Sequence, residues 1–407
     1  MSGILFLAHR IPFPPDRGDK IRAHHILKHL AKLAPVHVGC FAETEKDFAG
    51  EAELARLSVS HCLVKRSKPL VLAGAEAVLS GKPVSLTAFY SPKLEQWVKR
   101  TIAEQAIDTI FVFSGQMGQY IPDGFAGRVI VDLCDVDSAK FEDYAAAGDR
   151  VWINRREGRL LAIEEERLAQ RCDATVLISD NEAQLFRSRL LAPHSASIHA
   201  IGNGIDAGFF NAEAVLPNCD ISEQPGPHFI FTGQMDYRPN ELAAIWSIEH
   251  FLPAIRERYP PAEFHVVGRN PTDALLKHKD VPGLTVWGEV VDVRPFLVAA
   301  DMAIIPLTIA RGVQNKVLEA MSMELPVMLT AEAATGITAT DGEHWLIEAA
   351  DPTAMVARFD ALWAEQNAFR SMGRAARHFV FDRHAWDAVL APLDKLVSGP
   401  GRARHAA

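Results

Sequence analysis

Short apolar runs alternate with amphipathic stretches along the whole chain. Most of these runs are continuous rather than alternating, as is typical of parallel strands covered by helices on both faces. The pattern predicts strands at Ile4–Ala8, Val36–Phe41, Thr109–Phe113, Val129–Leu133, Ala174–Ile178, Phe229–Gly233, Glu263–Val267, Leu284–Trp287, Met302–Pro306 and Val327–Thr330.

Helical patterns fill the intervals between these runs. Asn240–Arg258, for example, carries an apolar stripe that includes Leu242, Ile245 and Leu252. A second helix is expected over Trp152–Arg171, where the charge run from Glu164 to Arg167 is interpreted as a solvated face. Strand and helix in regular alternation indicate an α/β fold of doubly wound sheets.

The chain is too long for a single hydrophobic core, because cores stop growing at about 250–300 residues and this chain has 407. The stretch 211–227 is rich in proline and polar residues and is the best candidate for a linker. We therefore expect a first Rossmann-like domain at 1–210 and a second at 228–380. A C-terminal helix at 381–397 is expected to pack back on the first domain.

Composition narrows the class of protein. Apolar content of 48% and charged content of 23% are ordinary for a globular protein, and a net charge of −9 argues against a nucleic-acid partner. Five scattered cysteines without a C-x-x-C pair fit a reducing compartment. We expect a cytoplasmic protein with peripheral contact at the inner face of the plasma membrane.

The apolar segment Pro69–Val84 is the candidate for that contact. It is too short to span a bilayer, which needs about 18 apolar residues. Two interpretations stay open at this point. The segment is either a helix that faces the core or a surface that meets a membrane or a lipid acceptor.

The most informative stretch for function is Arg311–Val327, which follows the predicted strand Met302–Pro306. Its order of strand, loop, helix and strand places a helix N-terminus, with its unpaired N–H groups, at the carboxyl end of a strand. Cations at Arg311 and Lys316 suit a phosphate, and Glu319 on the same helix face suits sugar hydroxyls. Gln314 and Asn315 complete the polar loop, which predicts a nucleotide-sugar site.

Two other loops have the same character. Gly233 follows the strand Phe229–Gly233 and would let a diphosphate approach the backbone, while Arg238 would neutralise it. In the first half, Gly18 lies between the first strand and a helix and would likewise admit a ligand. The Gly18 loop does not contain the G-x-G-x-x-G fingerprint of dehydrogenases.

Acidic residues follow the strand Val129–Leu133. Asp135 could orient a sugar or serve as a base. Asp135 and Asp137 together also resemble a pair that binds a divalent cation. The alternative is that Asp137 and Ser138 cap a helix that begins near Ala139.

These motifs together resemble the family-4 glycosyltransferases of the GT-B fold. Within that family the resemblance is closest to the bacterial sugar transferases associated with exosortase (PEP-CTERM) and exopolysaccharide systems. The segments that carry it are Gly18–Arg22, Asn203–Asp206, Gly233–Asn240, His265–Pro271, Gly288–Pro295 and the run ARGVQNKVLEAM from Ala310.

The resemblance implies two Rossmann-like domains that face each other across a cleft, and retention of anomeric configuration without a metal. Glu319 would match the second glutamate of the E-x7-E motif and bind the donor ribose. Gly18 would approach the diphosphate or the reacting sugar, and Gly233 would belong to the phosphate loop.

This sequence departs from the family pattern at several points: the usual partner lysine falls near Pro239, and Cys134 and Asp135 occupy the turn where a histidine is often found. Arg311 stands where the first glutamate of E-x7-E would be, and Gln234 stands where an arginine is usual. We infer that Arg311 and Lys316 supply the positive charge that is otherwise lost.

The sequence is therefore interpreted as a retaining glycosyltransferase of exopolysaccharide biosynthesis. It would move a hexosyl group from a nucleotide-diphosphate sugar, as substrate, to a glycan or polyprenyl-linked acceptor, without a cofactor or metal. Asp135 is the candidate catalytic residue. Two alternatives stay open, a sugar-nucleotide epimerase of the same fold and a non-catalytic binding subunit.

Overall fold

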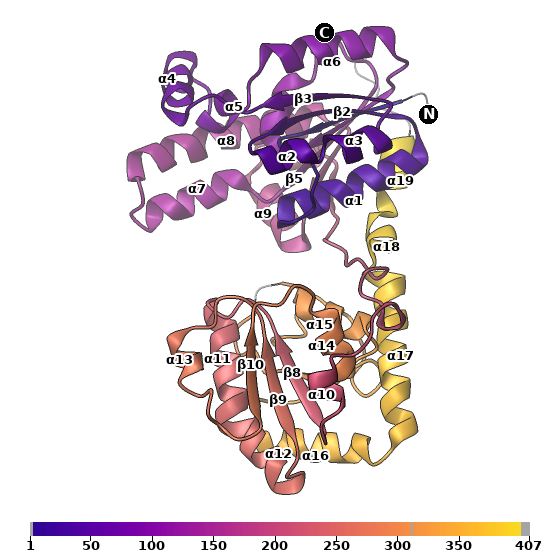
Figure 1. Cartoon of the computed structure of the whole chain (residues 1–407). Helices are drawn as coiled ribbons and strands as arrows, with labels where there is room; N and C mark the ends of the chain where they lie inside the picture. The colour runs from indigo at the N-terminus through magenta and orange to yellow at the C-terminus, as the bar shows by residue number, and fades with distance from the viewer. Residues whose placement is uncertain (1–2, 311, 400–407) are drawn as a thin grey trace. The chain divides into compact units, whose positions relative to one another are not determined.

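The computed structural model describes residues 3–310 and 312–399, which fold into two compact units (Figure 1). The first unit extends to Asn203 and takes up the chain again from Val389, and the second unit comprises Gly204–Ala388. Each unit has its own apolar core around a parallel sheet.

The first unit is built on a seven-stranded parallel sheet of order β3-β2-β1-β4-β5-β6-β7. All strand pairs in it are parallel, and β1 lies in register with β2 on one side and β4 on the other. The strands are β1 (Ile4–Ala8), β2 (Val36–Ala42), β3 (Ser60–Lys65), β4 (Thr109–Phe113), β5 (Arg128–Cys134), β6 (Ala174–Leu177) and β7 (Ile198–Ala200).

Helices connect these strands. They are α1 (Gly18–Leu33), α2 (Glu45–Ala49), α3 (Glu51–Leu57), α4 (Leu70–Ser80), α5 (Val84–Ala88), α6 (Pro92–Glu104), α7 (Asp137–Ala146), α8 (Val151–Arg171) and α9 (Asp180–Arg189), with short 3-10 turns at Gly115–Tyr120 and Pro193–Ser195. The C-terminal helix α19 (Pro392–Ser398) also belongs to this unit, where Asp394 pairs with His29 of α1 at 2.7 Å.

The second unit is built on a six-stranded parallel sheet of order β10-β9-β8-β11-β12-β13. Its strands are β8 (His228–Thr232), β9 (Glu263–Val267), β10 (Leu284–Gly288), β11 (Met302–Ile305), β12 (Val327–Leu329) and β13 (Leu346–Ile347). Its helices are α10 (Cys219–Ser222), α11 (Arg238–Trp246), α12 (Leu252–Arg258), α13 (Asp273–Leu276), α14 (Arg294–Ala299), α15 (Asn315–Ser322), α16 (Pro352–Trp363), α17 (Gln366–Arg383) and the start of α18 (Trp386–Leu390), with a 3-10 turn at Ala212–Ala214.

The α/β fold with two parallel sheets is confirmed, and each of the ten predicted strands is present within one or two residues. The strands missed by the pattern are β3, β7 and β13. All three lie at a sheet edge. Strands β7 and β13 contain only three and two residues, and β3 is only partly buried. Edge strands need no continuous apolar run, so their sequences give a weak signal.

The predicted helix Asn240–Arg258 is interrupted by a π-helical turn, Ser247–Phe251, between α11 and α12. Pro253 lies two residues beyond this segment and cannot donate a backbone hydrogen bond, which accounts for the irregularity. The buried stripe also differs from the expected one. Ile248 and Phe251 are buried, whereas Leu242, expected in the stripe, is 38% exposed.

The segment 211–227, expected to link two domains, lies inside the second unit. Its composition is that of a loop, but Ile221 is fully buried in the second core and the Asn218 N–H donates to Pro295 O at 2.9 Å. The chain passes between the units instead at Asn203 and at Val389. The buried Ile221 attaches this segment to the second unit, and the overall composition of the segment does not reveal that contact.

The expected caps of the helix after Val136 are also different. Asp137 is the first residue of α7 and makes no capping bond; it pairs with Lys140 at 3.1 Å. The N–H of Ser138 is instead bound by Glu165 of α8 at 2.9 Å. Glu165 lies within the charge run expected to be solvated, yet it is buried, and burial raises its pKa to about 7.

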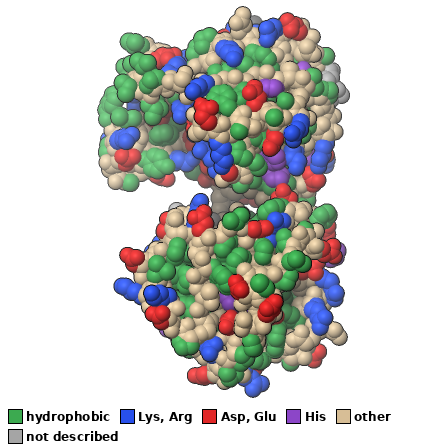
Figure 2. Space-filling view, viewed as in Figure 1, with side chains coloured by type: hydrophobic (Ala, Val, Ile, Leu, Met, Phe, Trp, Pro, Cys, Tyr) green, Lys and Arg blue, Asp and Glu red, His purple; other side chains and the backbone are tan. Residues whose placement is uncertain are grey.

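Among the described residues, no helix combines the length and the apolar character needed to cross a bilayer. Helix α4 faces the core only through small side chains, Ala73 and Ala77, which are fully buried. The side chains of Leu70, Val71, Leu72, Val78 and Leu79 are all more than 60% exposed. Figure 2 shows hydrophobic side chains gathered on this part of the first unit.

A buried ion pair ties the first unit together. Arg22 of α1 is 2% exposed and donates to Asp132 of β5, with Nε to Oδ2 at 2.9 Å. The same guanidinium donates to Ile201 O at 2.8 Å and Gly202 O at 2.7 Å, the last residues before the chain leaves the unit. Asp132 in turn accepts from the Cys134 N–H at 2.9 Å. A charge buried this deeply is tolerated because its polar atoms are paired.

R22M should therefore lower the free energy of unfolding of the first unit by about 3–5 kcal/mol, because it leaves a buried carboxylate without its cation. The double variant R22M/D132N should recover part of this loss, because the amide is neutral and its oxygen still accepts from the Cys134 N–H. Urea unfolding monitored by circular dichroism measures both. A double variant no more stable than R22M would contradict the assignment.

Candidate functional site

The second sheet reverses its strand order between β8 and β11, and the candidate site lies at the carboxyl ends of these two strands. From β8 the strand order runs to β9 and β10 on one side, and to β11, β12 and β13 on the other. In open parallel sheets ligands bind at such a switch point. Gly233 directly follows β8, and the loop that leads to α15 follows β11.

Two glycines form the floor of this site. Gly233 and Gly268 directly follow β8 and β9 and have φ angles of +153° and +156°, which side-chain-bearing residues rarely adopt. A Cβ on Gly268 would lie 1.6 Å from Gly233 O, so the two loops can approach only because Gly268 has no side chain. A Cβ on Gly233 would lie 3.1 Å from Lys316 Nζ, which places this ammonium directly beside the glycine.

Lys316 of α15 is the central side chain of the site. Only 9% of the residue is exposed. Its Nζ donates to Asn240 Oδ1 and lies 4.6 Å from the centre of the Phe231 ring. Asn240 is itself fixed, because its Nδ2 donates to Gln234 O at 2.9 Å. The ammonium is thus held by an amide oxygen and an aromatic face.

Neither partner neutralises the charge. In the described part of the chain no carboxylate lies within 4 Å of Lys316 Nζ. Burial lowers the pKa of Lys316 to about 8, and the more distant Glu319 opposes that shift. A buried ammonium without a counter-ion is costly, and a bound anion would relieve that cost.

Glu319 lies one turn after Lys316 on α15 and is partly buried. Burial raises its pKa to about 7, against the opposing effect of Lys316. Across residues 3–310 and 312–399, no donor forms a hydrogen bond with this carboxylate. A desolvated carboxylate with free acceptor positions can bind the hydroxyl groups of a ligand.

The amino end of α15 is open. Gln314 is the N-cap residue but makes no side-chain capping bond, since its Nε2 donates to Gly312 O at 3.0 Å. Asn315 is the exposed first residue of the helix. Gln314, Asn315, Lys316 and Glu319 are therefore close together, as expected. Arg311 lies outside the described residues.

Arg238 forms an ion pair within its own helix. Its side chain is 73% exposed and donates to Glu241 Oε2 at 2.8 Å, within the first turn of α11. A different arginine, Arg269, follows Gly268 and donates to Gln234 Oε1 at 2.7 Å. Sequence reasoning did not assign Arg269 to the site. Its position directly after a strand-ending glycine was the available signal.

The first unit also has polar residues at the carboxyl end of β1. Gly18 is exposed and begins α1, and a Cβ there would meet no atom within 4 Å. Next to it, Asp19 lies 3.2 Å from His9 Nε2 and 2.9 Å from Arg10 Nη1. Although burial alone would raise it, hydrogen bonds from His9 and Arg17 hold the pKa of Asp19 well below its usual range.

His9 was not singled out from the sequence. It is buried between Phe113 and Phe89, and burial lowers its pKa. In the part of the chain that the structure describes, its Nδ1 has no hydrogen-bond partner. Its place directly after β1 was the only indication in the sequence, and the apolar run was interpreted as ending before it.

Backbone strain gathers at the same edge of the first sheet. Ser114 directly follows β4 and has a φ angle of +77°, and Cys134 ends β5 with a φ angle of +63°. Such angles in residues other than glycine cluster at functional sites. Asp135 comes next, and its side chain is 47% exposed and lies 3.5 Å from Lys140 Nζ. Asp135 and Asp137 thus share one cation, Lys140 of helix α7.

The structure resembles solved glycosyltransferases over nearly its entire length. It aligns with sucrose-phosphate synthase from Thermosynechococcus elongatus at a TM-score of 0.58 and 16% identity, covering 97% of this chain and 98% of that one. Anabaena HepE in complex with UDP gives 0.61 and 12%, covering 98% and 100%. TarM gives 0.60 and 9%, covering 98% and 99%.

These identities are low, so the likeness establishes the fold, which is GT-B. No curated protein sequence matches the chain. A family model does match part of it. Residues 226–365, which contain all the described residues of the Lys316 site, are similar to the family described as "Glycosyl transferases group 1".

Proposed function

We propose that this protein is a retaining glycosyltransferase that moves a sugar from a nucleoside-diphosphate sugar to a glycan or polyprenyl-linked acceptor in exopolysaccharide biosynthesis. The observation that carries the proposal is the buried Lys316 ammonium beside Gly233, which has no counter-ion in the described residues. The family match of residues 226–365 and the GT-B fold support it.

The structural neighbours indicate which ligands fit such a fold. Anabaena HepE was solved with UDP-glucose, and Staphylococcus aureus TarM was solved with UDP and alpha-GlcNAc-glycerol. By analogy, this protein would bind a nucleoside diphosphate in its second unit and a glycan-type acceptor.

In the proposed complex the diphosphate lies against Gly233, Lys316 and the open amino end of α15. Positive charge at this position stabilises the departing nucleoside diphosphate, so a divalent ion is not required for the transfer. Glu319 would accept hydrogen bonds from the ribose hydroxyls. Arg311 would contact the diphosphate, and Arg238 would contribute only if its side chain left Glu241.

The first unit would contribute the acceptor side. Gly18 would leave room for the reacting sugar or the diphosphate, and Asp135 would orient sugar or acceptor. No protein nucleophile is assigned. His9 and Asp19 are a second candidate pair for orientation, because they are mutually hydrogen-bonded at the end of β1.

Peripheral membrane contact is part of the proposal, through the apolar patch formed by Leu70, Val71, Leu72, Val78 and Leu79 of α4. The start of α8 lies beside this patch, since Arg156 donates to Ala77 O at 2.7 Å, and Trp152 of α8 is 71% exposed. Lys82 and Arg155 are exposed cations next to it. Apolar side chains flanked by cations fit the interface of an anionic bilayer, where a polyprenyl-linked acceptor would reside.

Two other functions fit the same fold, a sugar-nucleotide epimerase and a non-catalytic binding subunit. Incubation with nucleotide sugars, with and without a panel of glycan and polyprenyl-phosphate acceptors, separates them by NMR analysis of the products. Transfer that needs an acceptor supports the proposal. Conversion without acceptor indicates an epimerase, and binding without turnover across the panel indicates a binding subunit.

K316M should weaken binding of a nucleoside diphosphate about 10–100-fold, because a charge-assisted hydrogen bond contributes about 1.5–3 kcal/mol. Titration calorimetry with UDP, GDP and ADP measures this and also identifies the base. K279M is the matched control, since Lys279 is an exposed lysine of the same unit. Equal affinities of K316M and K279M would refute the site.

The pH dependence of binding should have two limbs. Lys316 loses its proton as the pH rises through about 8, so affinity should fall above that pH. Glu319 gains a proton as the pH falls through about 7, so ribose recognition should weaken below it. Affinity for the diphosphate measured from pH 6 to 9.5 should therefore be greatest between about 7 and 8. K316M should abolish the alkaline limb and E319Q the acid limb, and unchanged profiles in both would contradict the assignment.

The double variant V71E/L79E should reduce binding to vesicles of anionic phospholipid at least about tenfold without changing thermal stability, because both side chains are exposed. L191E/L216E is the control, with two equally exposed leucines outside the patch. Co-sedimentation with vesicles measures the difference. If both double variants bind as the wild type does, α4 is not a membrane contact.

A further inference from the structure

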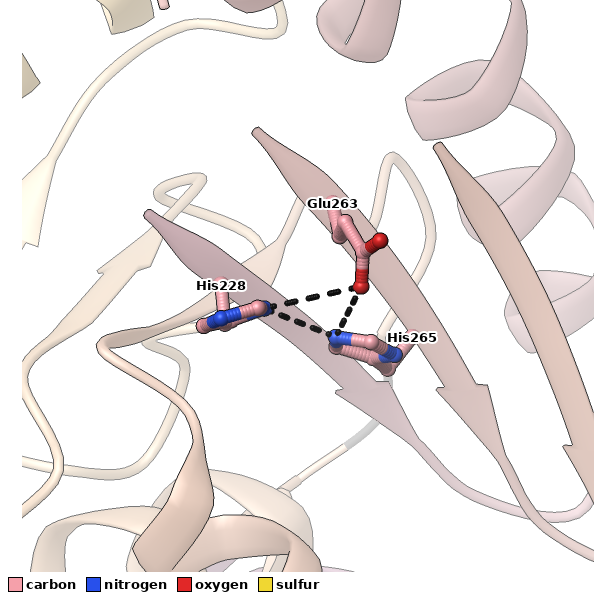
Figure 3. A group of neighbouring side chains, drawn as sticks. All are labelled: His228, Glu263 and His265. Carbon is pink, nitrogen blue, oxygen red and sulfur yellow. Dashed lines mark hydrogen bonds and ion pairs between the residues drawn. The ribbon is translucent and has the colours of Figure 1, made fainter. Parts of the chain in front are cut away.

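The amino end of the second sheet contains a cluster of ligating side chains that the proposed function does not use. His228 begins β8, and Glu263 begins β9 directly opposite it in the parallel register. His265 lies two residues further along β9, on the same face of the strand. Figure 3 shows the three side chains converging on one point.

The distances between their ligating atoms are those of a preformed metal site. His228 Nδ1 lies 3.2 Å from His265 Nε2, and Glu263 Oε2 lies 3.7 Å from each of these nitrogens. Tetrahedral zinc has bonds of about 2.0–2.1 Å, which place neighbouring ligand atoms about 3.3 Å apart. Shifts of a few tenths of an ångström would therefore close the site.

We propose that His228, Glu263 and His265 bind one divalent transition-metal ion of the zinc class. The set of two imidazoles and one carboxylate suits such an ion, whereas magnesium prefers oxygen ligands alone. Both histidines are buried, and the Glu263 side chain is 31% exposed. The partly exposed carboxylate would be the side on which the metal enters and on which water would be the fourth ligand.

His228 is already in the required tautomer. Its Nε2 lies 3.0 Å from Gln224 O, and a carbonyl oxygen can only accept, so Nε2 carries the proton. The lone pair is then on Nδ1, directed at the cluster. A backbone carbonyl that accepts from the outer nitrogen is the usual second-shell partner of a metal-bound histidine.

His265 must change tautomer. The indole N–H of Trp287 donates to His265 Nδ1 at 3.3 Å, which leaves the ring proton on Nε2, where it can donate to His228 Nδ1. Without metal the cluster is thus held by hydrogen bonds. A metal bound at Nε2 would move this proton to Nδ1. The Nδ1–H and the Trp287 N–H would then be two donors facing each other, with no acceptor between them. Trp287 must then turn away, so the indole reports metal binding.

The site is separate from the nucleotide site. His228 and Gly233 stand at opposite ends of β8, about 16 Å apart at the usual rise per residue. A metal here would join β8 to β9 at their amino ends and stabilise the second unit without taking part in the transfer. The inference does not depend on the proposed function.

The test uses the full-length protein, treated with chelator and then titrated with zinc chloride, with magnesium chloride as comparison. Calorimetry should show one zinc ion per chain, zinc in excess should raise the melting temperature by about 5 °C, and tryptophan fluorescence should change. Magnesium should have none of these effects. UDP affinity, measured in parallel, should be the same with and without zinc.

Three variants decide the site. E263Q alters a partly exposed side chain and should weaken zinc binding at least about tenfold, whereas W287F removes the opposing donor and should tighten it. H278N is the control, because His278 and Glu249 form a surface pair 3.5 Å apart that offers only two ligands. Zinc affinity that is unchanged in E263Q, or that falls equally in H278N, would overturn the proposal.

Discussion

The second unit depends on a positive charge that the protein buries without balancing. Lys316 is held in place by Asn240 and the Phe231 ring, and both of these are neutral. Positioning it there requires β8 and β9 to end in glycines that let their loops touch, and α15 to begin at the carboxyl end of β11. A structure that bears this electrostatic cost is pre-organised for an anion, because the ligand and not the protein completes the neutralisation.

The first unit treats its buried charge in the opposite way. Arg22 is fully paired with Asp132 and with the carbonyls of the departing chain, so it contributes to structure and offers nothing to a ligand. The buried carboxylates of helix α8 are paired in the same way. Glu157 accepts hydrogen bonds from the first N–H groups of α5, and Glu165 accepts one from the N–H of Ser138 in α7. Buried charges that are paired within the protein therefore have a structural role, whereas the unpaired Lys316 marks the binding site.

Much of the fold was predictable because buried parallel strands have continuous apolar sequences, and all ten strands predicted on that basis are present. The position of the motif from Gln314 to Glu319 was predictable as well, because it follows a predicted strand and therefore lies at the carboxyl edge of the sheet. Arg238 and Arg269 show the limit of such reasoning. Both follow strand-ending glycines, and only their contacts, with Glu241 and with Gln234, show which one stays near the phosphate loop.

Other features depended on contacts between residues distant in sequence. Glu165 looks like part of a solvated charge run until its hydrogen bond to Ser138, 27 residues away, is seen. The cluster of His228, Glu263 and His265 arises from strand register, which a single sequence does not reveal. Similarly, the exposure of α4 could not be deduced from its composition, because a helix apolar on all sides is normally buried.

The most direct test of the unbalanced charge is an NMR titration of the Lys316 ammonium, followed through its labelled Cε and assigned by comparison with K316M. The account predicts a pKa near 8 in the free protein and a clear rise when a nucleoside diphosphate binds. A pKa of Lys316 at the ordinary lysine value, or one that does not move with a saturating nucleotide, would contradict it.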